Sequence, residues 1–432
     1  MKVAMPLPWP KTRDEIARIQ RQRRIVAVER ALRAPFHAER LAGIDPAKVN
    51  DPEVWAKIPI LTKDELRAIS PQRFRDEFCI APRRDVAELW RSGGATGVPL
   101  FYPRTYEDMQ YGILAFSRTF TAAGAEAGES AHVSFPLGIH PVGHVYARAA
   151  QRVGIGVNWA GSGASTPSPM QIELIKLLRP SIWLGMSSYA IHLANMADAS
   201  GIDLSRYGVG LVMCSAEAIS AKKREKISRM WGARVHDNFG MTEAGMMGSE
   251  SRARDGFHIW TDMYAIEVVD LDSGEPVPEG EPGGLVVTPL WSNNATPFLR
   301  WSSGDIVTYR EEGGADGPLS VFPVIQHAHR TVGFFKIRGV NIDHQEFEDF
   351  LFSYEDLIDF KLELVTRDDA EILQVSIEVS GGRDPQQFAA RIAGDTRDTF
   401  QIKPEIIVLE RGTLAREFES ALKAPRFTDR RT

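Results

Sequence analysis

The stretch VGLVMCSAEAISAKKREKISRMWGARVHDNFG, residues 209–240, decides the fold. It opens with an apolar run of strand length and continues with a charged segment of helical pattern. It then closes on a second run of strand character. A strand, a helix and a strand in succession predict a parallel sheet that is covered by helices.

The same alternation extends toward the N-terminus of this stretch. Further apolar runs lie at 131–137, 153–160 and 181–186, with a helical pattern at 168–179. From Ala87 to about Val307 we therefore expect helix-covered sheets. Farther upstream, residues 11–36 are predicted to be a helix. Thr62 and Glu65 have the spacing of a capping box, which marks a helix start.

The pattern changes on the C-terminal side. Between Tyr264 and Tyr309 the apolar runs are separated by Gly and Pro pairs, which predicts mostly antiparallel strands. A loop at 311–318 is followed by a hairpin, a helix, two strands, a helix and a strand. The sequence thus predicts an α/β protein. Residues 1–329 would form a large N-terminal domain with a small β-rich subdomain, and residues 330–432 an α+β C-terminal domain.

Charge and composition limit the classes of partner. The chain has 432 residues, and 51 lysines and arginines stand against 57 aspartates and glutamates, a formal net charge of −6. This balance gives no reason to expect nucleic acid, and no apolar stretch reaches the roughly 18 residues of a membrane span. The first residues turn charged at once, unlike a signal peptide. We therefore expect a cytoplasmic enzyme without a nucleic-acid or membrane partner.

Common metal signatures are missing. Only two cysteines occur, Cys79 and Cys214, which excludes a disulfide framework and a four-cysteine zinc site, so no zinc is expected. His140 and His144 have the spacing of a metal-binding pair. Pro141 and Gly143 lie between them and argue against a helix, so we expect ordinary pocket or loop histidines.

The segment RSGGATGVP, residues 91–99, is rich in Ser, Gly and Thr. Glycines let backbone N–H groups approach an anion, so such a loop can cradle phosphates. An ordinary surface turn has the same composition, and the segment alone leaves both interpretations open. Two later segments, HDNFGMTEAG (236–245) and FLRWSSGDIVTY (298–309), favour the phosphate loop.

With IRGVNI (337–342), these segments follow one another in one order and spacing. In this respect the chain resembles the adenylate-forming superfamily and, within it, the phenylacetate–CoA ligase family. The motifs read SGGATG, FGMTE, WSSGD and HRTVGFFKIRGVN, joined by SAEAIS (215–220) and the tail KAPRFTDRR (423–431). The resemblance covers nearly the whole chain. It implies a mobile C-terminal domain that rotates between two half-reactions.

The resemblance also implies an AMP-forming acid–CoA ligase that uses ATP, Mg²⁺ and coenzyme A. A carboxylate attacks the α-phosphate, pyrophosphate leaves, and a thiol then displaces AMP. Transfer of the adenylate to a carrier protein or an amine stays open. So does a non-catalytic nucleotide-binding relic, because Val98 replaces the usual lysine of the loop, and His329 and Val332 depart from the motif.

Three residues are expected to be catalytic by resemblance. Thr242 would donate to the α-phosphate. Glu243 would hold Mg²⁺, or would merely be a first-turn acid that stabilises a helix dipole. Lys423 would reach the α-phosphate during adenylation only. Arg338 and Gly339 would line the tunnel for the pantetheine of CoA.

The nucleotide site is implied in the same way. The phosphate loop would hold the β- and γ-phosphates, a strand end would wall the adenine, and Phe239 would stack on it. Asp305 would bind the ribose hydroxyls, or would be only a turn residue after Gly304. The full set is Ser92, Gly93, Gly94, Thr96, Gly97, Ser215, Ala216, Glu217, Asp237, Asn238, Phe239, Gly240, Met241, Asp305 and Arg330.

The acid pocket is expected at the strand ends. Phe135 and Trp159 are large, which favours an acid of phenylacetate or substituted-benzoate size. His140 would meet a second polar group on the acid, or would bond only a backbone carbonyl. The expected lining is Phe135, Gly138, Ile139, His140, Trp159, Gly161 and Met246. A small hydroxylated aliphatic acid stays open, as does a homodimer.

Overall fold

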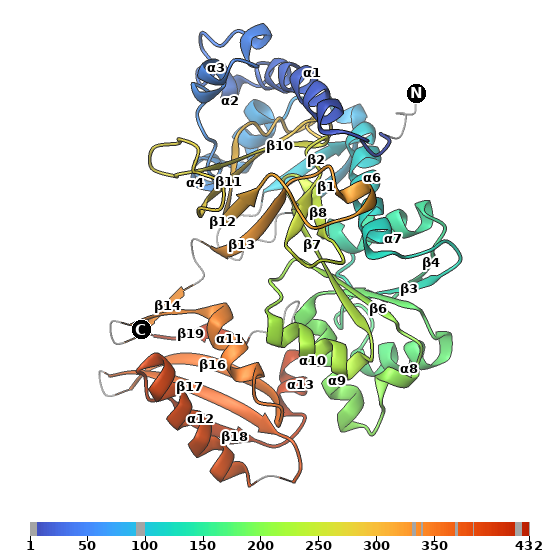
Figure 1. Ribbon diagram of the computed structural model, residues 1–432, viewed down its shortest axis with the longest axis vertical. Coiled ribbons are helices and arrows are strands. Elements are labelled where there is room, and N and C mark those ends of the chain that lie inside the picture. Colours follow the sequence, from blue (N-terminus) through green and yellow to red (C-terminus); the bar gives the residue numbers. More distant parts are fainter. Residues whose placement is uncertain are drawn as a thin grey trace. The chain divides into compact units, whose positions relative to one another are not determined.

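The computed structural model describes residues 7–91, 100–330, 334–337, 340–367, 370–382, 384–419 and 426–431 (Figure 1). The chain divides into two compact units, each assembled from three stretches. Unit 1 comprises Met1–Gly128, Leu137–Gly156 and Asp237–Thr331. Unit 2 comprises Glu129–Pro136, Val157–His236 and Val332–Thr432. Separate domains at 1–329 and 330–432, and the mobility of the second, stay predictions.

Unit 1 contains antiparallel strands in the order β10–β11–β12–β13–β9–β8–β7. Neighbouring strands in this series pair antiparallel. For β10, β11 and β12 this confirms the prediction from the Gly and Pro pairs between 264 and 309. The strands are β7 (Arg234–Met241), β8 (Gly245–Glu250), β9 (Phe257–Ile259), β10 (Tyr264–Val269), β11 (Gly283–Pro289), β12 (Trp301–Arg310) and β13 (Val324–Arg330). Strand β7 begins among residues of unit 2 and ends in unit 1.

Unit 1 also contains the antiparallel pair β1 (Val86–Arg91) and β2 (Phe101–Thr105). Helix α6 (Tyr106–Ala123) follows β2 directly, and a capping box between Thr105 and Asp108 fixes its start. Helix α7 (Pro141–Arg152) packs with α6, and Ser117 Oγ donates to the carbonyl of Ile113 within α6.

The N-terminal helices follow the sequence pattern with one interruption. Helix α1 (Arg13–Ala31) ends earlier than expected, and α2 (Pro35–Ala38) begins anew at Pro35. A residue before proline is disfavoured in helical conformation, and Ala34 is extended with φ −89° and ψ 122°. The capping box at Thr62 and Glu65 is confirmed at the start of α4 (Lys63–Arg67). Helix α3 (Pro52–Ala56) and α5 (Pro71–Arg73) complete this region.

One local prediction is wrong. The sequence predicted no helix between His140 and His144 because Pro141 lies between them, yet α7 begins at Pro141. A proline at the first helical position loses no hydrogen bond, because that N–H has no partner within a helix anyway. His144 lies within α7, and its Nε2 accepts the N–H of Gly138 at 3.0 Å.

The first part of unit 2 is the predicted helix-covered parallel sheet. Its strands run in the order β6–β5–β3–β4, and β5 is parallel to both β3 and β6. They are β3 (Ser130–Val133), β4 (Gly156–Trp159), β5 (Ile182–Gly185) and β6 (Leu211–Ser215). The helices are α8 (Ser168–Leu178), α9 (Ser187–Ala199) and α10 (Ala221–Trp231). The ring centroids of the buried residues Trp183 and Trp231 lie 5.3 Å apart, and this contact joins β5 to α10.

The C-terminal part of unit 2 has the predicted α+β pattern. Its sheet has the order β18–β17–β16–β19, with β16 and β17 antiparallel and both outer strands parallel to their neighbours. The strands are β14 (Phe334–Ile337), β15 (Val340–Asp343), β16 (Leu357–Arg367), β17 (Ala370–Val379), β18 (Glu405–Leu409) and β19 (Phe427–Asp429). The helices are α11 (His344–Phe352), α12 (Pro385–Phe400) and α13 (Thr413–Phe418). Strands β14 and β15 form the expected hairpin.

Within unit 2, buried polar contacts tie this C-terminal part to α9 and α10. Arg426 forms a two-fold ion pair with Asp359, at 2.8 and 3.0 Å, and Asn195 of α9 donates to the same carboxylate at 3.1 Å. Lys226 of α10 donates to the carbonyls of Leu357 and Ile358. Burial lowers the pKa of Lys226 to about 8, while the neighbouring carboxylate of Asp359 acts against this shift.

Candidate active site

Thr242 and Glu243 lie in the turn between β7 and β8 of unit 1. The two strands approach closely, and a Cβ atom on Gly240 would lie 2.5 Å from the carbonyl oxygen of Gly245. Gly245 has φ +92°, which glycine adopts without strain. The segment therefore forms a hairpin. The alternative in which Glu243 is the first-turn acid of a helix is wrong.

Two residues of β2 hold this turn. The hydroxyl of Tyr102 donates to Oε1 of Glu243 at 3.3 Å. One terminal nitrogen of Arg104 donates to the carbonyl oxygens of both Thr242 and Glu243, each at 2.7 Å. Glu243 is 7% exposed and Arg104 only 2%. The turn is thus fixed by a hydroxyl and a buried guanidinium.

Asp237 and Asn238 are buried in β7, and their polar atoms join β7 to β8. The N–H of Asp237 donates to Glu250 Oε2 at 2.9 Å, and Asn238 Oδ1 accepts the hydroxyl of Ser249 at 2.7 Å. The ring of Phe239 lies 5.5 Å from that of Phe257. These contacts position the strand, while the expected contacts of Asp237, Asn238, Phe239, Gly240 and Met241 with adenine stay predictions.

Asp305 is buried in β12, and its backbone pairs with that of Arg330 in β13. His327 Nε2 lies 3.2 Å from Asp305 Oδ1, and the hydroxyl of Ser303 accepts the N–H of Asp305 at 3.0 Å. Because Asp305 lies within a strand, the alternative of a simple turn residue is wrong. Its contact with ribose, and that of the Arg330 side chain, stay predictions.

Ser215 is the last residue of β6 in unit 2, and Ala216 and Glu217 follow it. Ala216 has φ +69°, an uncommon backbone conformation for a residue with a side chain. The carboxylate of Glu217 accepts the N–H and the hydroxyl of Ser188, at 2.9 and 2.8 Å, and the hydroxyl of Ser187 at 3.0 Å. The Glu217 side chain therefore caps the N-terminus of α9. The expected adenine wall of these three residues stays a prediction.

The expected acid-pocket residues belong to both units. Gly138, Ile139, His140 and Met246 belong to unit 1, and Phe135, Trp159 and Gly161 to unit 2. Trp159 is 42% exposed and Ile139 52%, whereas Phe135 and Met246 are buried. Burial lowers the pKa of His140, and Arg91 lowers it further. A common pocket of these residues stays a prediction.

Several expected site residues lie outside the described residues. They are Ser92, Gly93, Gly94, Thr96 and Gly97 of the phosphate loop, Arg338 and Gly339 for CoA, and Lys423. Two residues that flank Lys423 in sequence are described. The carboxylate of Glu419 accepts the N–H of Ser168 at 2.7 Å and lies 2.8 Å from His192 Nε2. Arg426 makes the buried pair with Asp359.

The described residues contain no group of three His, Cys, Asp or Glu side chains that could enclose a metal ion. A Mg²⁺ ion usually takes one or two carboxylates and completes its shell with water and substrate phosphates. The single carboxylate of Glu243 fits that mode of binding. No helix among the described residues is long and apolar enough to cross a membrane.

Sequence reasoning did not identify Tyr102, Arg104, Glu250 or His327. All four contact an expected site residue. Arg104 carries the clearest signal in the sequence, because it is a charged residue within the largely apolar run LFYPRT, two residues before α6 begins. Its partners lie 138 and 139 residues away along the chain, beyond the reach of any local motif.

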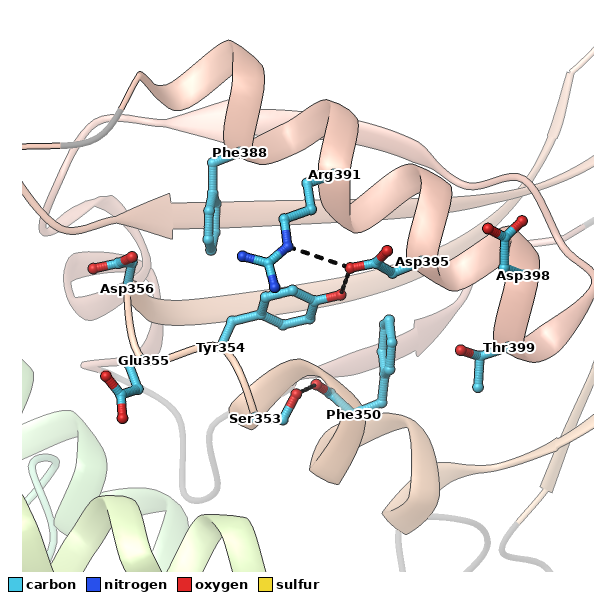
Figure 2. A pocket seen from close by; sticks show the side chains of 10 residues that line it. All are labelled: Phe350, Ser353, Tyr354, Glu355, Asp356, Phe388, Arg391, Asp395, Asp398 and Thr399. Atoms are coloured by element: carbon cyan, nitrogen blue, oxygen red, sulfur yellow. Dashed lines mark hydrogen bonds and ion pairs between the residues drawn. The ribbon is translucent and has the colours of Figure 1, made fainter.

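Two hollows in the described structure include none of the expected site residues. One of about 490 Å³ lies between the end of α11 and α12 (Figure 2). There the hydroxyl of Tyr354 donates to Asp395 at 2.7 Å, and Arg391 lies over the Tyr354 ring at 5.2 Å. Another, of about 580 Å³, is lined by Trp9, Arg252 and residues 314–319.

Comparison with known proteins connects the site to an activity. Residues 4–289 match the family described as AMP-binding enzyme. The phenylacetate-coenzyme A ligase of Thermus thermophilus is 30% identical over 381 residues, 85% of this chain and 82% of that protein. The one from Pseudomonas putida is 28% identical over 351 residues, 80% and 77% of the two chains.

Solved structures share the fold. A 2-hydroxyisobutyryl-CoA ligase in the postadenylation state matches with a TM-score of 0.83 at 21% identity, over 98% of this chain and 94% of that chain. An anthranilate CoA ligase bound to anthranoyl-AMP matches with a TM-score of 0.54 at 18% identity, over 79% and 68%. At these identities the likeness shows the fold.

The hairpin with Thr242 and Glu243, the strand with Asp305 and the family match define the class: this is an adenylate-forming enzyme. More closely, the chain belongs to the phenylacetate–coenzyme A ligase family of the AMP-binding enzymes. It is an AMP-forming acyl-CoA ligase that works through an acyl-adenylate.

Proposed function

We propose that the chain activates a small aromatic acid, of phenylacetate or substituted-benzoate size, and transfers its acyl group to CoA. The observation that carries this proposal is a set of four phenylacetate-coenzyme A ligases. They are between 26% and 30% identical to the chain over 80% to 97% of its length. Trp159 is 42% exposed and would supply aromatic area for such a ring.

The first half-reaction forms the adenylate. A carboxylate oxygen of the acid bonds to the α-phosphorus, the bond to the β-phosphate breaks, and pyrophosphate leaves. Thr242 would donate to the α-phosphate and Lys423 would neutralise the developing charge. Asp305 would accept both ribose hydroxyls. In the second half-reaction the CoA sulfur bonds to the acyl carbon, AMP leaves, and the thiol proton passes to solvent.

Glu243 would hold Mg²⁺, which supplies charge neutralisation of the phosphates when bound. The buried carboxylate suits this task because Tyr102 and Arg104 fix the turn that carries it. A carboxylate that is already oriented loses little freedom when the metal binds. Substitution of Glu243 by Gln would therefore remove the metal ligand and keep the shape of the turn.

A second candidate is a small hydroxylated aliphatic acid. It is favoured by the match to 2-hydroxyisobutyryl-CoA ligase over 98% of this chain. His140, the residue before α7, could bond a hydroxyl on the acid. The two candidates differ in the apolar area that the acid must bury, so they predict different acids of highest kcat/KM.

A carrier-protein thiol is the alternative acceptor. Triostin synthetase I of Streptomyces triostinicus is 27% identical over 294 residues, which cover 61% of this chain. The expected CoA residues Arg338 and Gly339 cannot separate the two acceptors, since both present a pantetheine thiol. A cytoplasmic location and a homodimer stay predictions.

The test is a pyrophosphate-release screen over phenylacetate, substituted benzoates, 2-hydroxyisobutyrate and other short hydroxy acids. Each acid is assayed without acceptor, with CoA and with a pantetheinylated carrier protein. The products are identified by mass spectrometry. The highest kcat/KM for an aromatic acid, with a CoA thioester as product, is the expected result. A preference for a hydroxy acid or for the carrier thiol would contradict the corresponding part of the proposal.

A further inference from the structure

Arg104 touches the turn of Thr242 and Glu243, and no motif assigns it a role. Its guanidinium is almost completely buried. One terminal nitrogen donates to both carbonyls of the turn, and the other donates to the carbonyl of Ser292 at 3.1 Å. The ring of Trp90 lies 4.7 Å from its central carbon. Arg104 therefore joins β1, the turn and the segment after β11.

This cation is bound in an unusual way. Within the described chain, no carboxylate oxygen lies within 4.0 Å of Arg104, although buried arginines such as Arg118 and Arg426 pair with aspartates. Burial lowers the pKa of Arg104, and the more distant carboxylates of Asp108 and Glu243 oppose this effect. A guanidinium stays protonated in proteins. A positive charge is thus retained beside Glu243 without direct neutralisation.

The geometry of the peptide bond determines which groups of the turn point away from the Arg104 charge. The described peptide bonds are trans, so each N–H points opposite to the carbonyl of the same peptide group. The carbonyls of Thr242 and Glu243 face Arg104, and the N–H groups of Glu243 and Ala244 therefore face away from it. Among the described residues, neither N–H has an acceptor. Donation to a carbonyl polarises the peptide group and strengthens its N–H as a donor.

We infer that Arg104 is a positioning residue for adenylation. By holding the two carbonyls, it directs the N–H groups of Glu243 and Ala244 and the Glu243 carboxylate toward Mg·ATP. Arg104 itself acts through the turn. The inference rests on the roles proposed for Thr242 and Glu243, and it adds the residue that sets their geometry.

Arg104→Met and Arg104→Lys test the inference. Methionine fills much of the same volume without charge or donors, and should lower kcat of ATP–pyrophosphate exchange about 100-fold, as for a misplaced catalytic group. It should weaken Mg·ATP binding in calorimetry and leave KM for the acid unchanged. Lysine keeps the charge but lacks the planar fork, and should give an intermediate loss.

Arg23→Met is the matched control. Arg23 also donates to a backbone carbonyl, that of Leu290 at 2.9 Å, and lies over the Trp291 ring at 4.0 Å, but it does not touch the turn. This variant should lower the melting temperature and keep both kcat of exchange and Mg·ATP affinity. A structural role of Arg104 alone would make the two methionine variants behave alike.

The inference is overturned if a folded Arg104→Met variant keeps the Mg·ATP affinity and exchange rate of the unchanged protein. If that variant does not fold, Arg104→Lys decides in the same way. An unchanged protein that forms no adenylate with any acid would contradict the proposed function instead. Calorimetry with Mg·ATP would then still decide whether Arg104 sets the geometry of the turn.

Discussion

Asp305 is the residue expected to bind the ribose hydroxyls of ATP. It lies in the interior of β12, 6% exposed, with a histidine nitrogen 3.2 Å from one oxygen. Nδ1 of His327 is buried and has no partner among the described residues. The imidazole contact orients the Asp305 carboxylate, and an oriented carboxylate would lose little freedom when it accepts a substrate hydroxyl.

Asp305→Ala should weaken ATP binding. Each ribose hydrogen bond to a carboxylate contributes roughly 1.5–3 kcal/mol, so the loss should be at least tenfold in affinity. Calorimetry with Mg·ATP measures it directly. Asp272→Ala removes an exposed aspartate of the same unit and should leave the affinity unchanged. Equal affinity in both variants would exclude Asp305 from the nucleotide site.

Two buried histidines should make folding stability depend on pH. Burial lowers the pKa of His37 and of His132 to about 4, below the usual value of about 6.5. The unfolded chain therefore binds protons at a higher pH than the folded chain. Their contribution to the free energy of unfolding is fully present above about pH 6.5. This contribution falls as the pH approaches 4, by up to about 3 kcal/mol for each histidine.

Urea unfolding between pH 7 and 5.5 checks this, since carboxylates stay ionised there. His132→Asn cannot take up the proton, and should flatten the dependence of the unfolding free energy on pH. His344→Asn is the control, because its pKa is lowered less strongly and its ring is only partly buried. An unchanged slope in His132→Asn would show that His132 binds protons equally in the folded and the unfolded chain.

At the scale of a single element, the expected site depends on the β7–β8 hairpin. It brings Thr242 and Glu243 to a turn, and its first strand carries Asp237 to Met241. Cross-strand contacts such as Asn238 with Ser249 fix its register. A change in the pairing of these two strands would therefore move the expected adenine contacts of Asp237 to Met241 and the expected phosphate contact of Thr242 together.

Gly240→Ala should disturb this element. A Cβ atom would lie 2.5 Å from the carbonyl oxygen of Gly245 and 2.9 Å from Cα of Met246, both of them backbone atoms that cannot rotate away. We expect roughly 1–3 kcal/mol of destabilisation and a strong loss of adenylation. Gly210→Ala, where a Cβ meets no atom within 4 Å, should be close to the unchanged protein in melting temperature and exchange rate. Normal exchange in Gly240→Ala would contradict the dependence on this hairpin.

The elements that sequence predicted well are those with local causes. Thr62 and Glu65 form their capping box within one helical turn, and the antiparallel strands after Tyr264 follow from local glycines and prolines. Pro141 was misread because a proline that ends a helix and one that begins it look alike in sequence. The resemblance located Glu243 and Asp305, but Arg104 and His327 contact them only through tertiary structure.

At the scale of the whole chain, the role of Lys423 in only one step of a two-step reaction stays a prediction. Lys423→Ala should slow acyl-adenylate formation by orders of magnitude and spare thioester formation from a supplied acyl-adenylate. An interaction made in one transition state changes only that step. ATP–pyrophosphate exchange measures the first step, and mass spectrometry of the CoA thioester the second.

Gly339→Trp should do the opposite, because a bulky ring would block the pantetheine route and leave adenylation largely intact. Equal loss of both half-reactions in folded Lys423→Ala would contradict a lysine that acts in one conformation. Both variants keep the side chains of Glu419 and Arg426, which hold contacts within unit 2. A melting temperature close to that of the unchanged protein would show that each variant is folded.

The interleaving of the two units has a consequence for biosynthesis. Passing from N- to C-terminus, the chain moves between them at 128, 136, 156, 236 and 331, so both stay incomplete until late in translation. A nascent polypeptide released before residue 237 lacks β8 to β13 of unit 1, and one released before residue 332 lacks the four-stranded sheet of unit 2. The growing chain therefore contains long stretches of strand-forming sequence without pairing partners, and unpaired strand edges of this kind are prone to aggregation.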